Sequence, residues 1–263
     1  MVNQWKHIML EQGNGWALLT LSRPKVLNAL NQELLQELNE AITWVEQADD
    51  VRVLILTGAG DKAFVAGADI AELRQIDSAL EAEKVALQGQ ALFNRIENLS
   101  KPVIMAVNGF ALGGGCELSL CGDIILSSDN ARFGLPEVNL GVIPGYGGTQ
   151  RLARAIGKNM AKYLCMTGDF LTAAEAKELG LVQKLIPKEH LLDEAKQLAE
   201  KIAQKAPLAL NLIKKAVHRG LDTDLQTGLG VEAAYFGLAF QTDDRLEGMD
   251  AFLQKRQPQF KGR

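Results

Sequence analysis

The spacing of hydrophobic and polar positions predicts a chain in which strands and helices alternate at first and helices dominate afterwards. Short apolar runs between glycine, asparagine or aspartate residues indicate buried strands, and leucine or isoleucine recurring every three or four positions indicates amphipathic helices. The segments expected to form strands are 8–11, 16–21, 51–57, 103–107, 124–127, 131–133 and 182–186. The segments expected to form helices are 31–48, 85–99, a short stretch after residue 113, 151–156, 158–166, 172–179, 189–204, 207–220, 225–240 and 243–255.

The order of these elements indicates the fold class. The first two strands are expected to pair as a hairpin, because Gly13-Asn14-Gly15 between them tolerates positive φ angles. The strands that follow alternate with helices, an order typical of α/β domains. Beyond Thr149 nearly every segment has helical spacing. The sequence therefore predicts an α/β core followed by a helical C-terminal portion.

Composition narrows the class of protein. The chain has 263 residues, of which 47% are hydrophobic and 23% charged, enough for one large core. Its longest apolar runs are far shorter than the ~20 residues of a membrane-spanning helix, and residues 1–7 lack the apolar core of a secretion signal. Three cysteines cannot form a disulfide framework, so we expect a cytoplasmic protein without a membrane span. These cysteines, expected to be small buried residues, are Cys116, Cys121 and Cys165.

The charge of the chain and the absence of familiar catalytic motifs argue against several functions. The net charge is −4 and no run of five like charges occurs, which argues against a nucleic-acid-binding arm or an acidic tail. The three histidines, His7, His190 and His218, have no nucleophile motif beside them. The sequence also lacks the Gly-x-Ser-x-Gly, His-Glu-x-x-His, Cys-x-x-Cys and phosphate-loop motifs. We therefore expect no catalytic histidine and no metal site.

Glycine is abundant, with 25 residues, and two glycine-rich turns each follow a buried strand. The first turn is 60–69 and the second is 108–117, which contains Gly113-Gly114-Gly115. A glycine run that opens a helix presents unpaired N–H groups, and with the helix dipole they suit an oxygen that gains negative charge. The alternative is that these glycines only allow a helix to pack closely against a sheet.

Two glutamates lie near these turns in apolar surroundings. Glu117 follows the glycine run, and Glu137 follows Pro136 in the segment 133–139. A buried carboxyl group has a raised pKa, as a general acid working near neutral pH requires. Each glutamate could instead be a salt-bridged or capping residue, but two acids beside a candidate oxyanion turn favour catalysis.

Several segments together resemble the enoyl-CoA hydratase (crotonase) family. They are 63–70 (Ala-Phe-Val-Ala-Gly-Ala-Asp-Ile), 108–118 (Asn-Gly-Phe-Ala-Leu-Gly-Gly-Gly-Cys-Glu-Leu) and 133–152, and the similarity runs from Arg23-Pro24 to Arg256. The resemblance implies a crotonase-like spiral of β-β-α units with a helical C-terminal region. It divides the chain into a core, 1–200, that carries the active site, and a trimerisation region, 201–263. It also implies a homotrimer or a hexamer of two trimers.

The resemblance implies an oxyanion hole made by the N–H groups of Ala68 and Gly114, which would hold the thioester carbonyl of an acyl-CoA. It implies that Glu117 and Glu137 hold one water, which adds to C3 of a trans-2-enoyl thioester while a proton is delivered to C2. We assign water activation chiefly to Glu117 and proton delivery to Glu137. The implied enzyme is an enoyl-CoA hydratase, a lyase of fatty-acid metabolism such as β-oxidation. It needs no cofactor, since coenzyme A enters with the substrate.

The resemblance also places residues around the coenzyme A moiety. Some relatives carry lysine where this chain has Ala71, so the cations that contact the CoA phosphates must lie elsewhere. The candidates are Lys25, Lys62, Arg74, Lys101 and Lys255. The expected substrate-binding residues are Ala66, Gly67, Ala68, Asp69, Ile70, Gly114, Lys25, Phe252 and Lys255, the last two near a neighbouring subunit's site.

Two alternatives remain open at this point. One is another reaction of the same fold, either double-bond isomerisation or hydration of a branched or carboxylated enoyl-CoA, which the acyl pocket would distinguish. The other is RNA binding, which salt-sensitive retention on RNA would reveal. The predicted helices 85–99 and 189–204 mix both charge signs, which disfavours RNA binding.

Overall fold

The computed structural model describes residues 5–263. A six-stranded sheet forms the centre, with strand order β1-β2-β3-β5-β7-β10, and a four-stranded sheet with order β4-β6-β8-β9 lies beside it. The strands of the first sheet are β1 Ile8–Gln12, β2 Trp16–Leu21, β3 Val53–Gly58, β5 Val103–Val107, β7 Ile124–Ser128 and β10 Lys184–Ile186. Those of the second are β4 Ala63–Val65, β6 Phe110–Leu112, β8 Arg132–Gly134 and β9 Phe170–Thr172.

From β3 to β8 consecutive strands alternate between the two sheets, which makes the fold a spiral. The pairs β3/β4, β5/β6 and β7/β8 each add one strand to the large sheet and the next to the small one. Pairing is parallel except between β1 and β2 and between β8 and β9. The structure therefore confirms an α/β fold built from β-β-α units.

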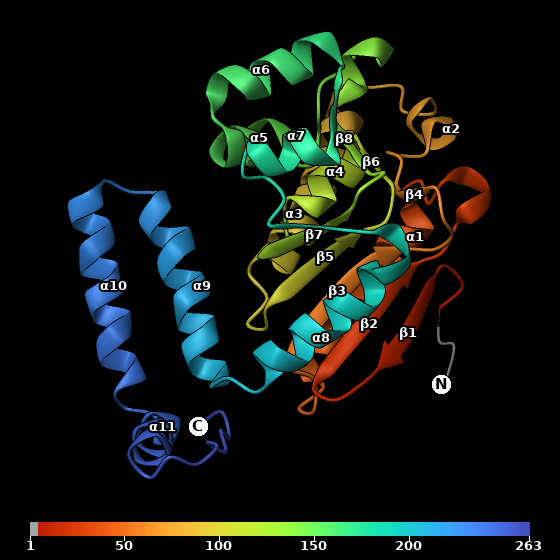
Figure 1. Cartoon of the computed structure of the whole chain (residues 1–263). Helices are drawn as coiled ribbons and strands as arrows, with labels where there is room; N and C mark the ends of the chain where they lie inside the picture. The colour runs from red at the N-terminus through yellow and green to blue at the C-terminus, as the bar shows by residue number, and fades with distance from the viewer. Residues whose placement is uncertain (1–4) are drawn as a thin grey trace.

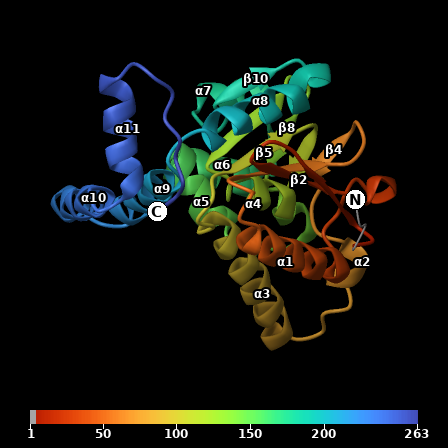
Figure 2. The same cartoon turned by 90° about the horizontal axis from the view of Figure 1, so that it is seen from below.

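Helices cover the large sheet on both faces, as Figure 2 shows for α1 and α3 on one side and α8 on the other. In β3, Leu54 and Leu56 pack toward α1 and α3, whereas Val53 and Ile55 pack toward α8. A strand buried on both faces has no polar alternation. This double burial explains why the sequence of β3 is continuously apolar.

The helices largely match the predicted segments. They are α1 Gln32–Gln47, α2 Ile70–Leu73, α3 Ala79–Glu97, α4 Gly114–Ser119, α5 Gly148–Ile156, α6 Lys158–Thr167, α7 Ala173–Glu178, α8 Leu191–Ala203, α9 Pro207–Leu221, α10 Leu225–Ala239 and α11 Asp243–Leu253. Three short 3-10 helices are η1 Pro24–Val26, η2 Pro136–Leu140 and η3 Lys188–His190. None of the helices within residues 5–263 is long and apolar enough to cross a membrane.

Several boundaries differ from the prediction. Helix α3 begins six residues early, because Ser78 caps it by accepting a hydrogen bond from the Glu81 N–H at 3.2 Å. Helix α5 begins at Gly148 rather than residue 151, and β3 begins at Val53 because Val51 closes a turn onto Ala48. The three-residue strands β4, β6 and β9 and the short helix α2 were not predicted, because such lengths carry no readable periodicity.

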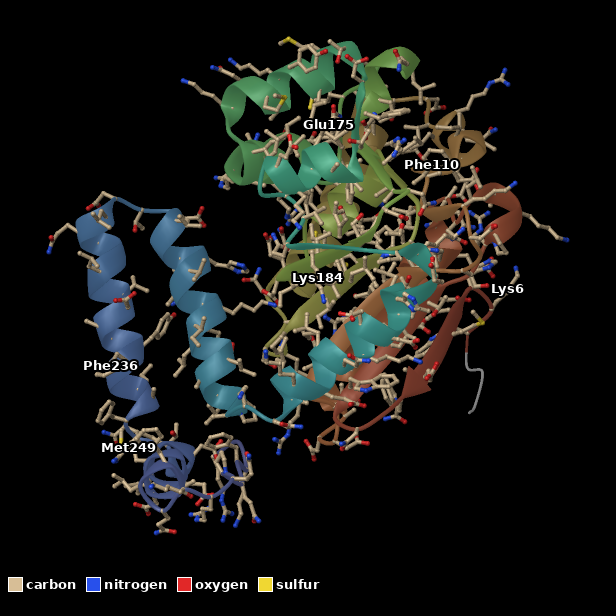
Figure 3. All side chains as sticks on the ribbon, in the orientation of Figure 1. Lys6, Phe110, Glu175, Lys184, Phe236 and Met249 are labelled. Carbon is tan, nitrogen blue, oxygen red and sulfur yellow. The ribbon has the colours of Figure 1, made fainter. Side chains whose placement is uncertain are left out.

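Helices α9, α10 and α11 extend away from the sheets, as Figure 1 shows in blue. We call α9–α11, together with the residues that follow them to residue 263, the C-terminal arm. Its link to the core includes a buried ion pair between Lys214 and Asp123 at 2.8 Å, and the Arg52 guanidinium donates to the carbonyls of Ala203 and Phe260. Figure 3 shows Phe236 and Met249 on this arm, where they are 67% and 46% exposed. Within one chain the arm therefore leaves apolar surface uncovered.

Two other expectations concern the cysteines and the N-terminus. Cys116 and Cys121 are buried as expected, whereas Cys165 is half-buried. Residues 1–4, which belong to the segment used to judge a secretion signal, lie outside the described residues.

Candidate active site

A cavity of about 370 Å³ lies where the two glycine-rich turns meet. Ala66, Gly67, Ala68, Gly113, Gly114, Glu117 and Glu137 line its polar side. Leu73, Ile76, Ala82, Val85, Ala86, Leu140, Val142, Ile143 and Tyr146 line its apolar side. The structure thus brings both glutamates and both expected oxyanion residues to one cavity, whose volume suits a small organic group.

The first turn is fixed on both sides of Ala68. Leu30 donates its N–H to the Gly67 carbonyl and accepts the Asp69 N–H, each at 2.8 Å. Gly67 has a φ angle of +121°, a conformation that disfavours side chains. Among residues 5–263 the Ala68 N–H itself donates no hydrogen bond. The backbone therefore presents one donor at a defined position.

Two asparagines hold the chain that leads into this turn. The buried Asn28 amide donates to the carbonyls of Ala59 and Ala63, both at 2.9 Å. The Asn108 amide donates to the carbonyls of Gly58 and Gly60, at 2.9 and 3.0 Å. These side chains satisfy carbonyl groups at the end of β3, in the turn and at the start of β4. They explain why asparagine stands at both positions.

The second turn opens α4 and lies against the first. A Cβ atom on Gly115 would lie 1.9 Å from the Val65 carbonyl oxygen, and one on Gly114 would lie 3.8 Å from the Ala68 nitrogen. Within the described chain the Gly114 N–H also lacks an acceptor. Gly115 therefore allows close packing against β4, and Gly114 presents its N–H group. Two adjacent N–H donors of this kind can stabilise an oxygen that becomes negatively charged.

Glu117 lies in α4 and is 2% exposed. Its Oε1 accepts hydrogen bonds from the Tyr146 N–H at 2.8 Å and the Gly148 N–H at 2.7 Å. Burial raises the pKa of the Glu117 carboxyl group, and the two N–H donors oppose this rise because they stabilise the charged form. An oriented carboxylate in an apolar site suits a general base.

Glu137 lies in η2 and is half-buried. Its Oε2 is buried and has no hydrogen-bond partner in the described part of the chain, while Oε1 lies 3.1 Å from the position of a Cβ on Gly113. Burial, with the charge of Glu117 as a smaller cause, raises the pKa of Glu137 to about 7. The group is therefore partly protonated near neutral pH and can donate a proton.

The other predicted site residues divide into four groups. Ala66, Gly67 and Ile70 line the cavity, whereas Asp69 caps α2 and pairs with Arg23 at 3.0 Å instead. Lys25 is exposed in η1 and lines no part of the cavity. Phe252 of α11 and Lys255, two residues beyond the end of α11, do not line the cavity within one chain.

Lys101 was wrong as a candidate for contact with CoA. Its ammonium group donates to the carbonyls of Val45 and Ala48 at the end of α1. Burial lowers the pKa of Lys101, and the last carbonyls of a helix are natural partners for a lysine. Lys101 is therefore a structural residue.

Sequence reasoning missed the groups that hold Glu117 and the apolar wall. Tyr146 and Gly148 act through backbone N–H groups, so their side chains gave no chemical signal. The only available sign was that the glycine-rich segment 145–148 lies within 133–152, one of the segments that resemble the family. The apolar wall combines α2, α3 and the segment 140–146, which are far apart in the sequence.

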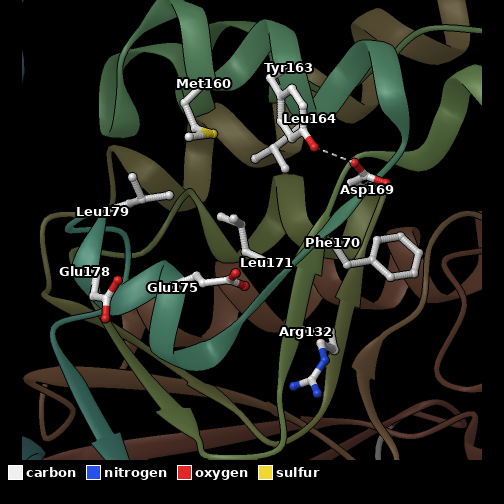
Figure 4. Close-up of a pocket in the computed structure, with 10 residues that line it drawn as sticks. All are labelled: Arg132, Met160, Tyr163, Leu164, Asp169, Phe170, Leu171, Glu175, Glu178 and Leu179. Carbon is white, nitrogen blue, oxygen red and sulfur yellow. Dashed lines mark hydrogen bonds between the residues drawn. The ribbon is translucent and has the colours of Figure 1, made fainter.

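A larger hollow of about 660 Å³ lies elsewhere, among α6, α7, β8 and β9 (Figure 4). It is lined by Arg132, Met160, Tyr163, Leu164, Asp169, Phe170, Leu171, Glu175, Glu178 and Leu179. The Tyr163 hydroxyl donates to Asp169 at 2.9 Å on its rim. None of the predicted site residues lines this hollow, so we assign the chemistry to the smaller cavity. Within residues 5–263, no three His, Cys, Asp or Glu side chains gather as a metal site would require.

Comparison with known proteins gives consistent matches. The family model described as enoyl-CoA hydratase/isomerase matches residues 11–263. A crotonyl-CoA hydratase from Syntrophomonas wolfei is 49% identical, with 97% of this chain and 98% of that protein covered. A short-chain-enoyl-CoA hydratase from Clostridium acetobutylicum is 47% identical, with 95% of each covered. The crystal structure of an enoyl-CoA hydratase from Bacillus anthracis superposes with a TM-score of 0.93 at 42% identity, covering 98% of this chain and 100% of that one.

Proposed function

The chain belongs to the enoyl-CoA hydratase/isomerase family, and we propose that it adds water reversibly to trans-2-enoyl-CoA with Glu117 and Glu137 as its acid–base pair. Its similarity to relatives of almost equal length identifies an enoyl-CoA hydratase, an enzyme of the lyase class that yields 3-hydroxyacyl-CoA. The observation that carries the residue assignment is that two glutamates and two backbone N–H donors line one cavity.

The N–H groups of Ala68 and Gly114 form the oxyanion hole in this proposal. Addition of hydroxide at C3 moves electron density through C2 to the thioester oxygen, which becomes an enolate oxygen. The two donors and the positive end of α4 stabilise this charge as it develops, and one such donor is worth about 3–4 kcal/mol. Support comes from their adjacency and from the lack of other acceptors for them within residues 5–263.

Glu117 activates the water. Its Oε1 is fixed by two N–H groups, which favour the charged form that a general base needs. As the water oxygen bonds to C3, Glu117 takes one of the water protons.

Glu137 delivers its own carboxyl proton, while the second water proton stays on the oxygen as the new hydroxyl group at C3. Its pKa of about 7 leaves a substantial protonated fraction at neutral pH, and its carboxyl group gives that proton to C2 as the enolate collapses. The proton taken by Glu117 then replaces the one lost by Glu137. The sum adds one water across the double bond, and both glutamates return to their starting states.

We propose that the substrate has a short acyl group. The cavity of about 370 Å³ must hold the thioester, the water and the acyl chain together. Its acyl side is apolar, with Val85 and Ala86 of α3 facing the segment that carries Ile143. Crotonyl-CoA therefore fits better than a long-chain enoyl-CoA.

The proposed reaction requires no cofactor besides the substrate's own coenzyme A. Adding water to a conjugated thioester transfers no electrons, and the two carboxyl groups supply both proton transfers. We also propose a cytoplasmic protein, because the three cysteines are unpaired thiols.

We further propose that the chain forms a homotrimer or a hexamer through residues 201–263, with 1–200 as the core that carries the site. The exposed apolar side chains of the C-terminal arm support this, since monomers rarely expose so much apolar surface. They include Ile213, Val217, Leu225, Phe236, Leu246, Phe252 and Leu253. In such an assembly Phe252 and Lys255 would reach a neighbour's CoA, while Lys25 would serve the chain's own site.

A panel of trans-2-enoyl-CoA thioesters tests this function. The protein is assayed with crotonyl-CoA and longer homologues, with and without a chelator, by the loss of absorbance of the conjugated thioester. We expect the highest kcat/KM for crotonyl-CoA and no effect of the chelator. A preference for long chains would contradict the short-chain proposal, and loss of activity restored by a divalent ion would contradict cofactor-free catalysis.

A further inference from the structure

Arg151 of α5 makes a dense set of contacts beside the active site. Its Nη1 donates to the Tyr146 carbonyl at 3.0 Å, its Nε and Nη2 donate to Glu97 at 3.0 and 2.7 Å, and Nη2 also donates to Asn94. The Arg151 side chain is only 11% exposed. A planar guanidinium with several fixed donors suits such a three-way junction, whereas lysine has a single point charge. The mechanism described above gives Arg151 no role.

The segment that Arg151 grips is also held by α3. The Gln90 amide donates to the Gly145 carbonyl at 2.9 Å. The Tyr146 ring meets the Phe93 ring edge-on, with centroids 5.4 Å apart, and packs so closely on Gly89 that a Cβ there would lie 2.3 Å from the ring. Residues 89, 93 and 97 follow one another at four-residue intervals, as do 90 and 94. These two adjacent rows form one face of α3. This face and Arg151 together fix the segment 145–148.

The same segment supplies both N–H groups that hold Glu117 Oε1. The Tyr146 carbonyl therefore accepts a hydrogen bond from Arg151, while the Tyr146 N–H donates one to Glu117. We propose that Arg151 is a positioning residue for Glu117, acting through the Tyr146 backbone and anchored to α3 by Glu97 and Asn94. This inference rests on the proposed role of Glu117 as general base.

The positive charge of Arg151 also acts on Glu117 directly. Arg151 lowers the pKa of Glu117 against the larger effect of burial, which raises it. The other titratable groups whose charges interact with Glu117 are Glu137 of η2, Tyr146 of the segment 145–148, Cys116 of α4, Cys121 just beyond α4, and Cys165 of α6. Arg151 is the cation whose charge lowers the pKa of Glu117 and so opposes the rise caused by burial. Its removal should raise the pKa of Glu117 and require a higher pH to ionise the base.

The test compares Arg151→Gln and Arg151→Lys with a matched control, Arg95→Gln. Arg95 of α3 makes a similar network with Glu46, Asn39 and Thr43, but it touches α1 and not the segment 145–148. Arg95→Gln therefore reproduces the loss of an arginine network without disturbing Glu117. Each protein is assayed for crotonyl-CoA hydration over a range of pH, and its folding is followed by thermal unfolding.

We expect kcat of Arg151→Gln to fall about 10²-fold, because displacement of a catalytic group by about 1 Å has this cost. The acid limb of its kcat/KM profile should move to higher pH, and Arg151→Lys should restore the limb more than kcat. Arg95→Gln should keep the wild-type profile. If Arg151→Gln resembles Arg95→Gln in kcat and in the pH limb, Arg151 is merely structural and the inference is overturned.

A double-mutant cycle with Glu117→Gln separates this inference from the proposed role of Glu117. If Arg151 acts through Glu117, adding Arg151→Gln to Glu117→Gln should cost little further activity. Additive losses would overturn the inference while leaving Glu117 as the base. An unchanged kcat in Glu117→Gln alone would instead reject Glu117 as the base, and with it any positioning role of Arg151.

Discussion

Gly148 donates its N–H to Glu117 Oε1 across 2.7 Å, although the two residues are 31 positions apart in the sequence. Gly148 is the first residue of α5 and Glu117 lies in α4, so the N-terminus of one helix holds a carboxylate carried by another. The first N–H groups of a helix lack internal acceptors, and the helix dipole favours negative charge there. The position and the charge of Glu117 therefore depend on a backbone N–H group, which every residue except proline would supply at position 148.

Gly148→Ala should disturb this contact sterically. A Cβ on Gly148 would lie 2.9 Å from Glu117 Cγ and 3.0 Å from both Glu117 Oε1 and Leu135 Cδ1. The methyl group must displace the glutamate, so we expect kcat to fall about 10²-fold with a smaller change in KM.

Gly145→Ala is the matched comparison in the same segment. Its Cβ would lie 3.8 Å from the Ala86 Cβ, an ordinary contact. Steady-state kinetics of both variants should separate them by kcat. Equal kcat values would mean that Glu117 tolerates displacement.

Glu117→Gln and Glu137→Gln should each lower kcat by ~10²–10⁴-fold, as expected for the loss of a general acid or base. The KM for crotonyl-CoA should change little, since neither carboxyl group is expected to hold the CoA moiety. Because both act on one water, the double variant should lose much less than the product of the single losses. A single variant with near wild-type kcat would show that one glutamate suffices.

The pH dependence follows from the two raised pKa values. Glu137 must be protonated to donate to C2, and its pKa of about 7 predicts that kcat/KM for hydration falls as pH rises through this value. Glu117 must be charged, so activity also falls on the acid side, below the raised pKa of Glu117. A profile of kcat/KM from about pH 5 to about pH 9 should be bell-shaped. Its basic limb should disappear in Glu137→Gln, and a limb that persists there would belong to another group.

The sequence predicted those parts of the fold that depend on local pattern. Strand β5 is buried on both faces and reads as Val-Ile-Met-Ala-Val, and α1 begins at a residue that can cap it, since Asn31 accepts the Leu34 N–H. The motifs around Glu117 and Glu137 predicted a pair of acids beside an oxyanion turn. The structure places both glutamates and the residues of the oxyanion turn in one cavity.

What could not be predicted depends on backbone and on contacts distant in sequence. The identity of residues 146 and 148 does not indicate that the backbone N–H groups of Tyr146 and Gly148 donate to Glu117. Likewise, Lys101 carries the positive charge of a phosphate ligand, but its ammonium group donates hydrogen bonds to the carbonyls at the end of α1. Only the path of the folded chain distinguishes these roles.

The C-terminal arm gives the last prediction. Phe252 of α11 is 84% exposed, and Leu80 of α3, on the core, is 78% exposed. If the arm packs against neighbouring subunits, Phe252→Asp places a charge in an apolar interface, which is costly. Deletion of the chain after Asp243 should then act in the same direction and more strongly.

We expect both changes to reduce the mass measured by light-scattering chromatography and to raise the KM for crotonyl-CoA, because Phe252 and Lys255 are proposed to reach a neighbour's site. Leu80→Asp, with almost equal exposure but no place on the arm, should leave mass and KM unchanged. Lys255→Ala should raise KM without changing the mass, since it removes a cation but little apolar surface. A truncated protein that keeps both the oligomer and the KM would mean that the arm serves neither assembly nor CoA binding.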